Sequence, residues 1–282
     1  MKKVLGLICS PRKMGNCEIA VKEISRNIST PHELKLLRLA DFNILPCKGC
    51  YLCLFQLGHC IQKDDFHRVL DEILDADALI ISVPAYFMGP NATLKLLLDR
   101  GIAFYPHSEK LWGKPAIGVG IAGVREKEGY TLLGIENFLS VILAENKSSR
   151  IFYGAMPGEI FLDEQNKKAA VELASALFAP LPDKNEPCCP VCGGTTMRFL
   201  DRSQVRCMLC SNAGTVSIRG DRLAFDIQPS DREMFTDRQS AAKHRDWLIS
   251  MKQRYVQQRS MLKQISKPYE NQGTWVKPQL PD

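Results

Sequence analysis

Long apolar runs are absent from this sequence, and no stretch reaches the length that a membrane-spanning helix needs. The lysine-rich first residues are not followed by the apolar core and cleavage site of a signal peptide. Also missing are the dinucleotide fingerprint G-x-G-x-x-G and the Gly-Lys-Ser/Thr ending of a P-loop. No Ser-His-Asp set or carboxylate pair stands in a convincing catalytic context. These absences predict a soluble, cytoplasmic protein with no membrane partner, whose reactive atoms belong to a bound group.

Cysteine, by contrast, is abundant. The 282 residues include 11 cysteines, and eight of these fall into two groups with C-x-x-C spacing. In a reducing compartment this spacing indicates metal or redox chemistry more often than disulfides. The apolar fraction of 45% predicts a globular core, and the length allows one large domain and a smaller unit. A net charge of +6 suits an anionic cofactor as well as a nucleic acid, so it does not decide between them.

The first informative stretch is residues 4–17, VLGLICSPRKMGNC. Its apolar start predicts a strand that is buried on both faces, and a helical pattern follows. The strand, the small polar turn and the helix N-terminus together offer backbone N–H groups to an anion, and an arginine adds charge. The candidate phosphate contacts are Ser10, Arg12, Gly15, Asn16 and Cys17. The alternative is an ordinary strand-turn-helix without a ligand.

Strands and helices alternate along the first 180 residues. Apolar runs predict strands over 33–39, 78–84, 115–122 and 149–155 in addition to the first, and helical spacing predicts helices after Asp64 and over 89–102, 130–143 and 164–178. This alternation predicts an α/β fold with a doubly wound, five-stranded parallel sheet. Because ligands in such sheets lie beyond the carboxyl ends of the strands, we expect 10–17, 84–89, 122–130 and the region of Cys47 at one edge.

The turn after the third predicted strand carries the most recognisable pattern. It reads Pro84, Ala85, Tyr86, Phe87, Met88, Gly89, and Leu94-Lys95 and Asp99-Arg100 follow it. With the SPR…GN loop and with Ala122, Gly123 and Gly129, it resembles the NAD(P)H-dependent FMN reductase group of the flavodoxin-like superfamily. The resemblance implies that residues 10–17 hold the phosphate of FMN, that 84–89 contact its isoalloxazine ring and that 122–123 form a third flavin loop. Cys17 stands where the group usually has Ser or Thr, and core packing is the alternative role of Tyr86 and Phe87.

The first cysteine group lies in residues 40–63, a segment too long for a simple connection. Its members are Cys47, Cys50, Cys53 and Cys60, in the pattern C-x2-C-x2-C-x6-C. Closely spaced thiolates that turn toward one centre are what a 4Fe–4S cluster requires. Within this predicted fold, the motif resembles the iron-sulfur flavoprotein family, whose members carry such a cluster and FMN. The resemblance covers about residues 1–180 and implies a dimer or tetramer, while zinc or thiols without a ligand are the alternatives.

A second cysteine group follows a linker rich in proline and charge. Cys189 and Cys192 form one knuckle, Cys207 and Cys210 form another, and apolar residues around them predict short strands. Residues 186–228 are therefore predicted to be a zinc ribbon or a rubredoxin-like iron site, with zinc favoured over iron. Cys188 is expected to lie outside the ligand set, because using it would lengthen the first knuckle.

The last part of the chain has helical spacing over 230–265. Ala241, His244, Leu248, Met251, Tyr255, Leu262 and Ile265 fall close to a heptad seam, with Lys and Arg elsewhere. We expect a long helix that packs on its own domain or on a partner subunit; a basic arm for nucleic acid is the alternative. Residues 266–282 are expected to be a surface tail.

These patterns lead to three functional hypotheses. The first is an FMN-dependent oxidoreductase that passes electrons between a 4Fe–4S cluster and the flavin, with ferredoxin or NAD(P)H as donor and a small molecule as acceptor. The second is an NAD(P)H-dependent FMN or quinone reductase without a cluster. The third, and least favoured, is a metal-responsive protein whose ribbon contacts nucleic acid, because Arg198, Phe199, Arg202 and Arg206 offer only a thin basic and aromatic patch.

Overall fold

The computed structural model describes residues 1–181, 187–230 and 235–276. Its centre is a parallel sheet of β1 (Lys2–Ile8), β2 (His32–Arg38), β3 (Ala78–Tyr86), β5 (Pro115–Ala122) and β6 (Glu145–Tyr153), in the order β2-β1-β3-β5-β6. A two-residue strand, β4 (Gly89–Pro90), pairs antiparallel with the end of β3. The inner strands β1, β3 and β5 are the apolar runs in the sequence, and they are buried almost throughout. The predicted five-stranded, doubly wound sheet is confirmed.

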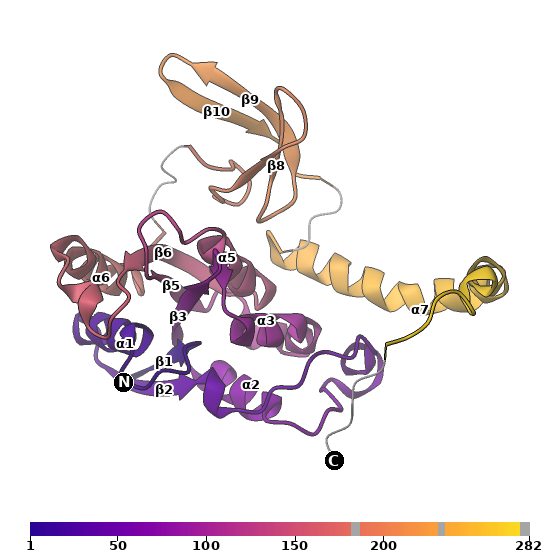
Figure 1. Ribbon diagram of the computed structural model, residues 1–282, viewed down its shortest axis with the longest axis horizontal. Helices are drawn as coiled ribbons and strands as arrows, with labels where there is room; N and C mark the ends of the chain where they lie inside the picture. The colour runs from indigo at the N-terminus through magenta and orange to yellow at the C-terminus, as the bar shows by residue number, and fades with distance from the viewer. Residues whose placement is uncertain (182–186, 231–234, 277–282) are drawn as a thin grey trace.

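Helices cover both faces of the sheet (Figure 1). On one face, α1 (Asn16–Arg26) and α6 (Glu164–Ala176) bury their apolar stripes in one core, together with residues of β1, β3 and β5. On the other face lie α2 (Phe66–Asp75), α3 (Ala92–Asp99) and α5 (Thr131–Val141), which share a second core. There the rings of Phe66, Phe104 and Phe138 form a chain of edge-to-face contacts, with ring centroids 5.7 and 6.5 Å apart.

Several predicted boundaries differ from the observed ones. Strand β6 begins at Glu145 and not at 149, and a register shift opposite Ala116 and Ile117 accommodates the earlier start. The segment predicted as one helix over 89–102 contains β4, α3 and the start of a 3-10 helix (Gly101–His107), which the short α4 (Ser108–Leu111) follows. Further single turns of 3-10 helix occupy Leu39–Asp41, Glu159–Phe161 and Lys267–Tyr269. Helix α2 has Asp65 as its N-cap residue, and the carboxylate of the preceding Asp64 accepts from the N–H of Phe66 at the start of the helix as well as from Arg100.

Asp64 forms a buried ion pair with Arg100, which directly follows α3. The Nη1 atom of Arg100 lies 2.6 Å from Oδ2 of Asp64, and both side chains are at most 1% exposed. Burial disfavours the charged carboxylate, but Arg100 and the backbone N–H groups of Leu45 and Phe66 donate to it and hold the pKa of Asp64 below its usual value. The Arg100 guanidinium lies 4.2 Å from the centroid of the Phe66 ring.

A small antiparallel sheet stands beside α5 (Figure 1). Its strands are β7 (Met197–Phe199), β8 (Gln204–Cys207), β9 (Ala213–Arg219) and β10 (Arg222–Ile227), in the order β10-β9-β8-β7. Glu136 of α5 is partly covered beneath it. Burial, and to a smaller extent the thiol of Cys207, raise the pKa of this carboxyl to about 7.

The C-terminal helix α7 (Arg238–Ser266) begins eight residues after the predicted start at 230. Its first turn is closed by a capping box, in which Asp237 accepts from the backbone N–H of Ser240 and the Ser240 hydroxyl accepts from the N–H of Asp237. Across the residues described, no helix combines the length and apolar character needed to cross a membrane.

We expect Asp64→Asn to lower the free energy of unfolding by about 3–5 kcal/mol, because it leaves the Arg100 charge buried without its partner. Asp99→Asn is the matched control, since Asp99 pairs with Lys95 on the same helix with both side chains largely exposed; this change should cost less than about 1 kcal/mol. Urea unfolding of both variants measures the difference. Equal losses would show that the burial of the pair is unimportant.

A second expectation concerns Glu136. A carboxyl whose pKa is raised in the folded protein stabilises it fully only below the pKa of the unfolded chain, and this stability is lost as the pH rises through about 7. Thermal unfolding at about pH 5 and about pH 8 should therefore show a larger decrease for the native chain than for Glu136→Gln. Glu172→Gln, an exposed change on α6, is the control and should keep the native pH dependence. An unchanged pH dependence in Glu136→Gln would contradict this account.

Candidate functional site

A cavity of 190 Å³ opens at the carboxyl edge of the parallel sheet. It is lined by residues from the loops after β1, β3, β5 and β6, as a doubly wound sheet requires. Nine of the predicted flavin contacts line it together: Ser10, Arg12, Gly15, Asn16, Cys17, Pro84, Ala85, Tyr86 and Gly123. Four others, Phe87, Met88, Gly89 and Ala122, are not among its lining residues. The structure thus gathers three separate sequence segments around one space.

The anion-binding part of this cavity is the start of α1. The N-cap residue is Gly15, which has no side chain to satisfy the amides of the first turn, so these N–H groups are available to a ligand. Arg12 lies in the same lining and adds a positive charge. Upstream of the helix, the backbone N–H of Met14 donates to the Glu18 carboxylate over 2.9 Å, which fixes the loop onto the first turn.

The side chain of Asn16 has a structural role that its sequence position did not reveal. Its amide nitrogen donates to the carbonyl of Gly154 over 2.9 Å, and its amide oxygen accepts from the N–H of Gly158 over 2.8 Å. Both partners belong to the loop after β6. Asn16 therefore joins this loop to α1, and its backbone N–H is the group that remains for a phosphate.

Cys17 lies beneath the loop as a neutral thiol. Burial raises its pKa to about 12, although Ser82 and the charge of Arg12 act in the opposite direction. Cys9 is also fully buried, and burial together with Cys17 raises its pKa. A neutral thiol does not repel a phosphate, so Cys17 is compatible with the cradle even though it is not a hydroxyl.

The turn at 86–89 places Phe87 outside the cavity, whereas Tyr86 lines it. Phe87 and Met88 both have positive φ angles, 49° and 65°, and they form the centre of the tight hairpin between β3 and β4. Such backbone is costly for residues with large side chains, and Phe87 is fully exposed. A neighbouring glycine explains how the turn is held: at Gly129, a Cβ would lie 2.0 Å from the carbonyl oxygen of Met88.

Four lining residues were absent from the sequence-based prediction: Ile121, Gly154, Ala155 and Pro157. The last three follow β6, the fifth strand of the sheet. The rule that ligands lie beyond the carboxyl ends could have found them, since β6 was predicted. The Glu159 carboxylate accepts from the N–H groups of Ala155 and Met156, each over 2.7 Å, and so fixes this loop. These bonds hold the pKa of Glu159 below its usual value.

The first cysteine group surrounds a separate, smaller pocket of 30 Å³. Cys47, Cys50, Cys53 and Cys60 all line it, together with Arg100 and residues of the 3-10 helix after α3. Burial, together with the charges of Cys60, Cys50 and Cys47, raises the pKa of Cys53 to about 11, which indicates that the four thiols lie close to one another. Cys47 and Cys50 are exposed, whereas Cys53 and Cys60 are partly covered. This pocket shares no lining residue with the cavity at the sheet edge, within the residues described.

The ends of the cysteine loop are fastened by hydrogen bonds. The carbonyl of Leu45 accepts from Arg100 Nη1 over 3.0 Å, and its N–H donates to Asp64 over 2.9 Å. After the cysteines, the carbonyl of Cys60 is 2.8 Å from Nε2 of His67. Inside the loop, Cys53–Leu57 is a π-helix, a rare form that is frequent at functional sites. The Nε atom of Arg100 is buried and has no hydrogen-bond partner among the described residues, although it lies at this pocket.

The donor set fits an iron-sulfur cluster. Four thiols around one pocket are what a cluster requires, and the Nε–H of Arg100, which has no partner among the described residues, offers a donor to a sulfur. A cluster is larger than a single ion, so its thiolates stand further apart than those of a zinc site. The cysteines of this loop accordingly do not form a compact single-ion group, unlike those of the ribbon.

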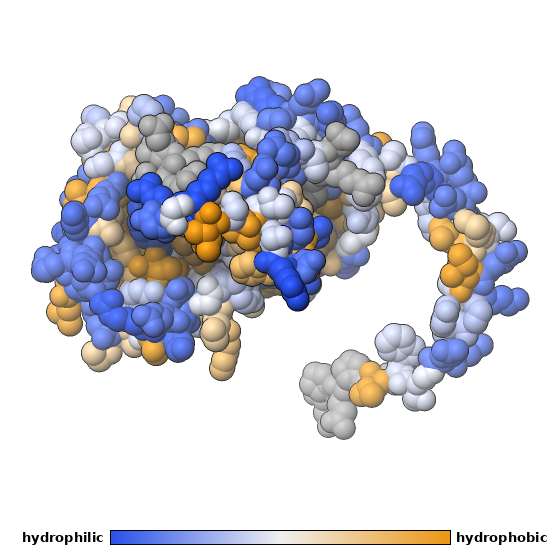
Figure 2. All heavy atoms as spheres, turned by 90° about the horizontal axis from the view of Figure 1, so that it is seen from above, coloured by the Kyte–Doolittle hydropathy of each residue, from blue (hydrophilic) through white to orange (hydrophobic). Residues whose placement is uncertain are grey.

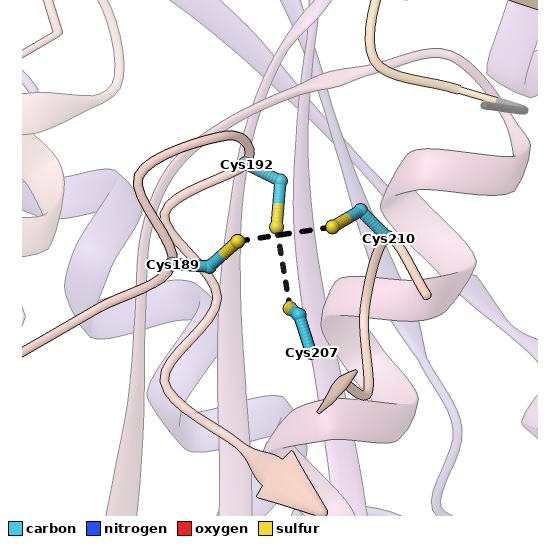
Figure 3. A group of neighbouring side chains, drawn as sticks. All are labelled: Cys189, Cys192, Cys207 and Cys210. Atoms are coloured by element: carbon cyan, nitrogen blue, oxygen red, sulfur yellow. Dashed lines mark hydrogen bonds between the residues drawn. The ribbon is translucent and has the colours of Figure 1, made fainter. Parts of the chain in front are cut away.

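The ribbon holds the compact group. The Sγ atoms of Cys189, Cys192, Cys207 and Cys210 all lie within 4.8 Å of one another, and they point toward a common centre (Figure 3). The N–H of Gly194 donates to Cys192 and the amide of Asn212 donates to Cys210, each over 3.4 Å. Hydrogen bonds from Cys192 and Cys210 lower the pKa of the Cys207 thiol. Cys188 is not part of this group, and the four sulfurs suit one tetrahedral ion.

Comparison with known proteins agrees with this geometry. A model of the NADPH-dependent FMN reductase family matches residues 2–142, which is half of the chain. An iron-sulfur flavoprotein of Methanocaldococcus jannaschii is 32% identical over 184 residues, which cover 62% of this chain and 93% of that protein. An iron-sulfur flavoprotein of Archaeoglobus fulgidus is 29% identical over 176 residues, covering 60% of this chain and 76% of that protein.

A solved structure extends the likeness in fold to the whole chain. A flavone reductase superposes with a TM-score of 0.75 at 16% identity, and the match covers 98% of this chain and 100% of that one. At this identity the likeness concerns the fold alone. The family match, by contrast, covers half of the chain, and the relative from Methanocaldococcus jannaschii is 32% identical over 93% of its own length. Together they establish common descent. The chain therefore belongs to the NADPH-dependent FMN reductase family, where it is related to the iron-sulfur flavoproteins, and is a flavin-dependent oxidoreductase.

Proposed function

We propose that this chain binds FMN at the sheet edge and a 4Fe–4S cluster in the cysteine loop, and passes electrons between them. The observation that carries the proposal is the pocket lined by all four cysteines of the loop in a chain that also has a phosphate cradle. Such a cluster exchanges electrons singly, whereas FMN exchanges them singly or in pairs, so together they couple a one-electron donor to a two-electron acceptor.

The residues of the cavity have distinct parts in this function. The first-turn amides of α1 and the charge of Arg12 would hold the phosphate, and the small residues Ala85 and Gly123 leave room for a flat ring against the loops. Tyr86 lines the cavity and is half exposed, so it can contact the ring from the side of the opening. No side chain is required to form a bond with the substrate.

The second candidate is a reductase that uses NAD(P)H and FMN without a cluster. The observation in its favour is that Cys47 and Cys50 are exposed, which leaves two ligands of a cluster open to solvent. A putative NAD(P)H-dependent FMN-containing oxidoreductase of Bacillus subtilis is 25% identical over 170 residues of the chain. Iron analysis of anaerobically prepared protein separates the two candidates.

For the ribbon we propose zinc with a structural role. Its four sulfurs lie around one centre on two knuckles that are joined to the small sheet, and the core of this unit has four buried apolar residues among those described, two of which are the ligand candidates Cys189 and Cys207. A single zinc ion would therefore contribute directly to the folding of this unit. A rubredoxin-like iron is the alternative, and metal analysis distinguishes them.

Two single cysteine variants test the assignment of both centres. Cys60→Ser should lose the iron, the sulfide and the broad absorbance near about 400 nm while it keeps flavin and zinc. Cys207→Ser should lose the zinc and keep about four irons per chain. Visible spectra and elemental analysis of oxygen-free preparations measure both. If the native protein contains flavin but no iron, even after reconstitution with iron and sulfide, the cluster is refuted and the second candidate stands.

The phosphate cradle is tested by Arg12→Ala. A hydrogen bond to a charged group contributes about 1.5–3 kcal/mol, so the Kd for FMN should rise roughly ten- to a hundredfold. Lys13→Ala is the control, because Lys13 is exposed and next in sequence but is not among the lining residues; it should change the Kd only slightly. Fluorescence titration of the apoprotein with FMN gives both constants. Equal effects would indicate that only the general positive field matters.

A further inference from the structure

Helix α7 leaves the body of the molecule about halfway along its length. Near its start, Ala241 and Leu248 are 5% and 7% exposed, and His244 packs among the rings of Tyr105, Phe235 and Trp247. From Met251 to Val276, by contrast, every residue is exposed. Figure 2 shows this arm standing clear of the rest of the protein, with apolar residues on its surface. We call residues 251–276 the arm.

The seam of α7 continues from the buried part into the arm, where Gln258 is its one polar position. Positions separated alternately by three and four residues include Ala241, His244 and Leu248 on the body, and then Met251, Tyr255, Gln258, Leu262, Ile265 and Tyr269 on the arm. Of the arm residues, Tyr255, Ile265 and Tyr269 are 55%, 59% and 65% exposed. The first part of the seam packs against protein, and the second has the same pattern but nothing over it. Such a run of exposed apolar side chains marks an interaction surface.

The charges on the arm exclude one kind of partner. Lys252, Arg254 and Arg259 flank the seam, and no Asp or Glu occurs between 247 and 269. Two arms that zipped together would bring like charges face to face, which destabilises a coiled coil. The cover of the seam is therefore a different surface from the arm itself.

We propose that the arm of each copy lies across the body of a second copy of this chain, so that two copies hold each other by reciprocal exchange. The arm emerges beside the cysteine loop, where Lys252 lies 5.9 Å from the centroid of the Phe55 ring. The rim of that loop carries the exposed apolar residues Leu45, Tyr51 and Ile61, which provide a surface for an incoming seam. This inference does not depend on which metal or flavin the chain binds.

The size of the contact agrees with a stable dimer. The stretch 251–269 is about 28 Å long as a helix, and a third of its circumference amounts to roughly 300 Å². Each of the two arms buries roughly 300 Å² of its own surface and a similar area on its partner. The total buried surface is therefore about 1,200 Å². This reaches the lower end of the range for specific, stable interfaces. A single arm on an unrelated protein would bury only half as much.

The test compares two double variants of the full chain that add the same charge to opposite faces of the arm. Leu262→Glu with Ile265→Glu alters the seam, and Gln257→Glu with Gln264→Glu alters the face away from it. We expect the native chain and the second variant to have twice the mass of one chain by light scattering at micromolar concentration. The seam variant should have the mass of one chain, with unchanged helix content by circular dichroism.

A milder change guards against loss of folding in the double variant. Leu262→Glu alone should raise the dissociation constant of the dimer at least tenfold in a dilution series. A native chain that is monomeric at these concentrations would overturn the proposal and leave the arm for a different protein. A seam variant that stays dimeric would overturn it as well, because the copies would then associate through other surfaces.

Discussion

The buried pair of Asp64 and Arg100 is the interaction on which the rest of the structure most depends. Asp64 follows the cysteine loop and Arg100 follows α3, so the pair joins two segments that are 36 residues apart. Both oxygens of the Asp64 carboxylate accept hydrogen bonds. Arg100 contacts both oxygens, and the N–H groups of Leu45 and Phe66 each donate to one of them. A charge pair at this depth stabilises a fold only when such bonds are complete. Here they fix the entry and the exit of the loop at one point.

The same pair connects the fold to the chemistry of the cysteines. Arg100 lines their pocket, and the charge of Cys60 favours the protonated guanidinium. When thiols bind iron they become thiolates, and a cation that is already held in place lowers the cost of gathering negative charge in a partly covered site. Asp64 keeps Arg100 from turning out to solvent. In the proposed function, this ion pair would therefore also support the cysteines that hold the metal.

Sequence patterns predicted the sheet and the grouping of the site, but not the partners of individual side chains. Apolar runs and the edge rule are local or topological signals, and nine of the flavin contacts predicted from the sequence line one cavity. Asn16 shows the limit: its side chain bonds to Gly154 and Gly158, which are 138 and 142 residues away, and no local pattern reveals that. Asp64 marks the start of a helix in the sequence, and its carboxylate does accept from the N–H of Phe66, but its ion-pair partner Arg100 lies at the end of another helix. The positive φ angles of Phe87 and Met88 were equally hidden, since neither residue type favours such backbone.

The relation between the two pockets follows from one short helix. Strand β3 ends in the loop that lines the flavin cavity, α3 begins at Ala92, and Arg100 at its far end lines the cysteine pocket. Eight residues of helix span about 12 Å. The two pockets share no lining residue among those described, and α3, whose buried leucines lie in the core, links the chain segments that line them. In the proposed function, this arrangement would leave the opening at the sheet edge free for a substrate, while the exposed cysteines of the loop would face an electron donor. The covalent link through α3 holds that spacing fixed, because the ion pair anchors one end of the helix and the β3–β4 hairpin anchors the other.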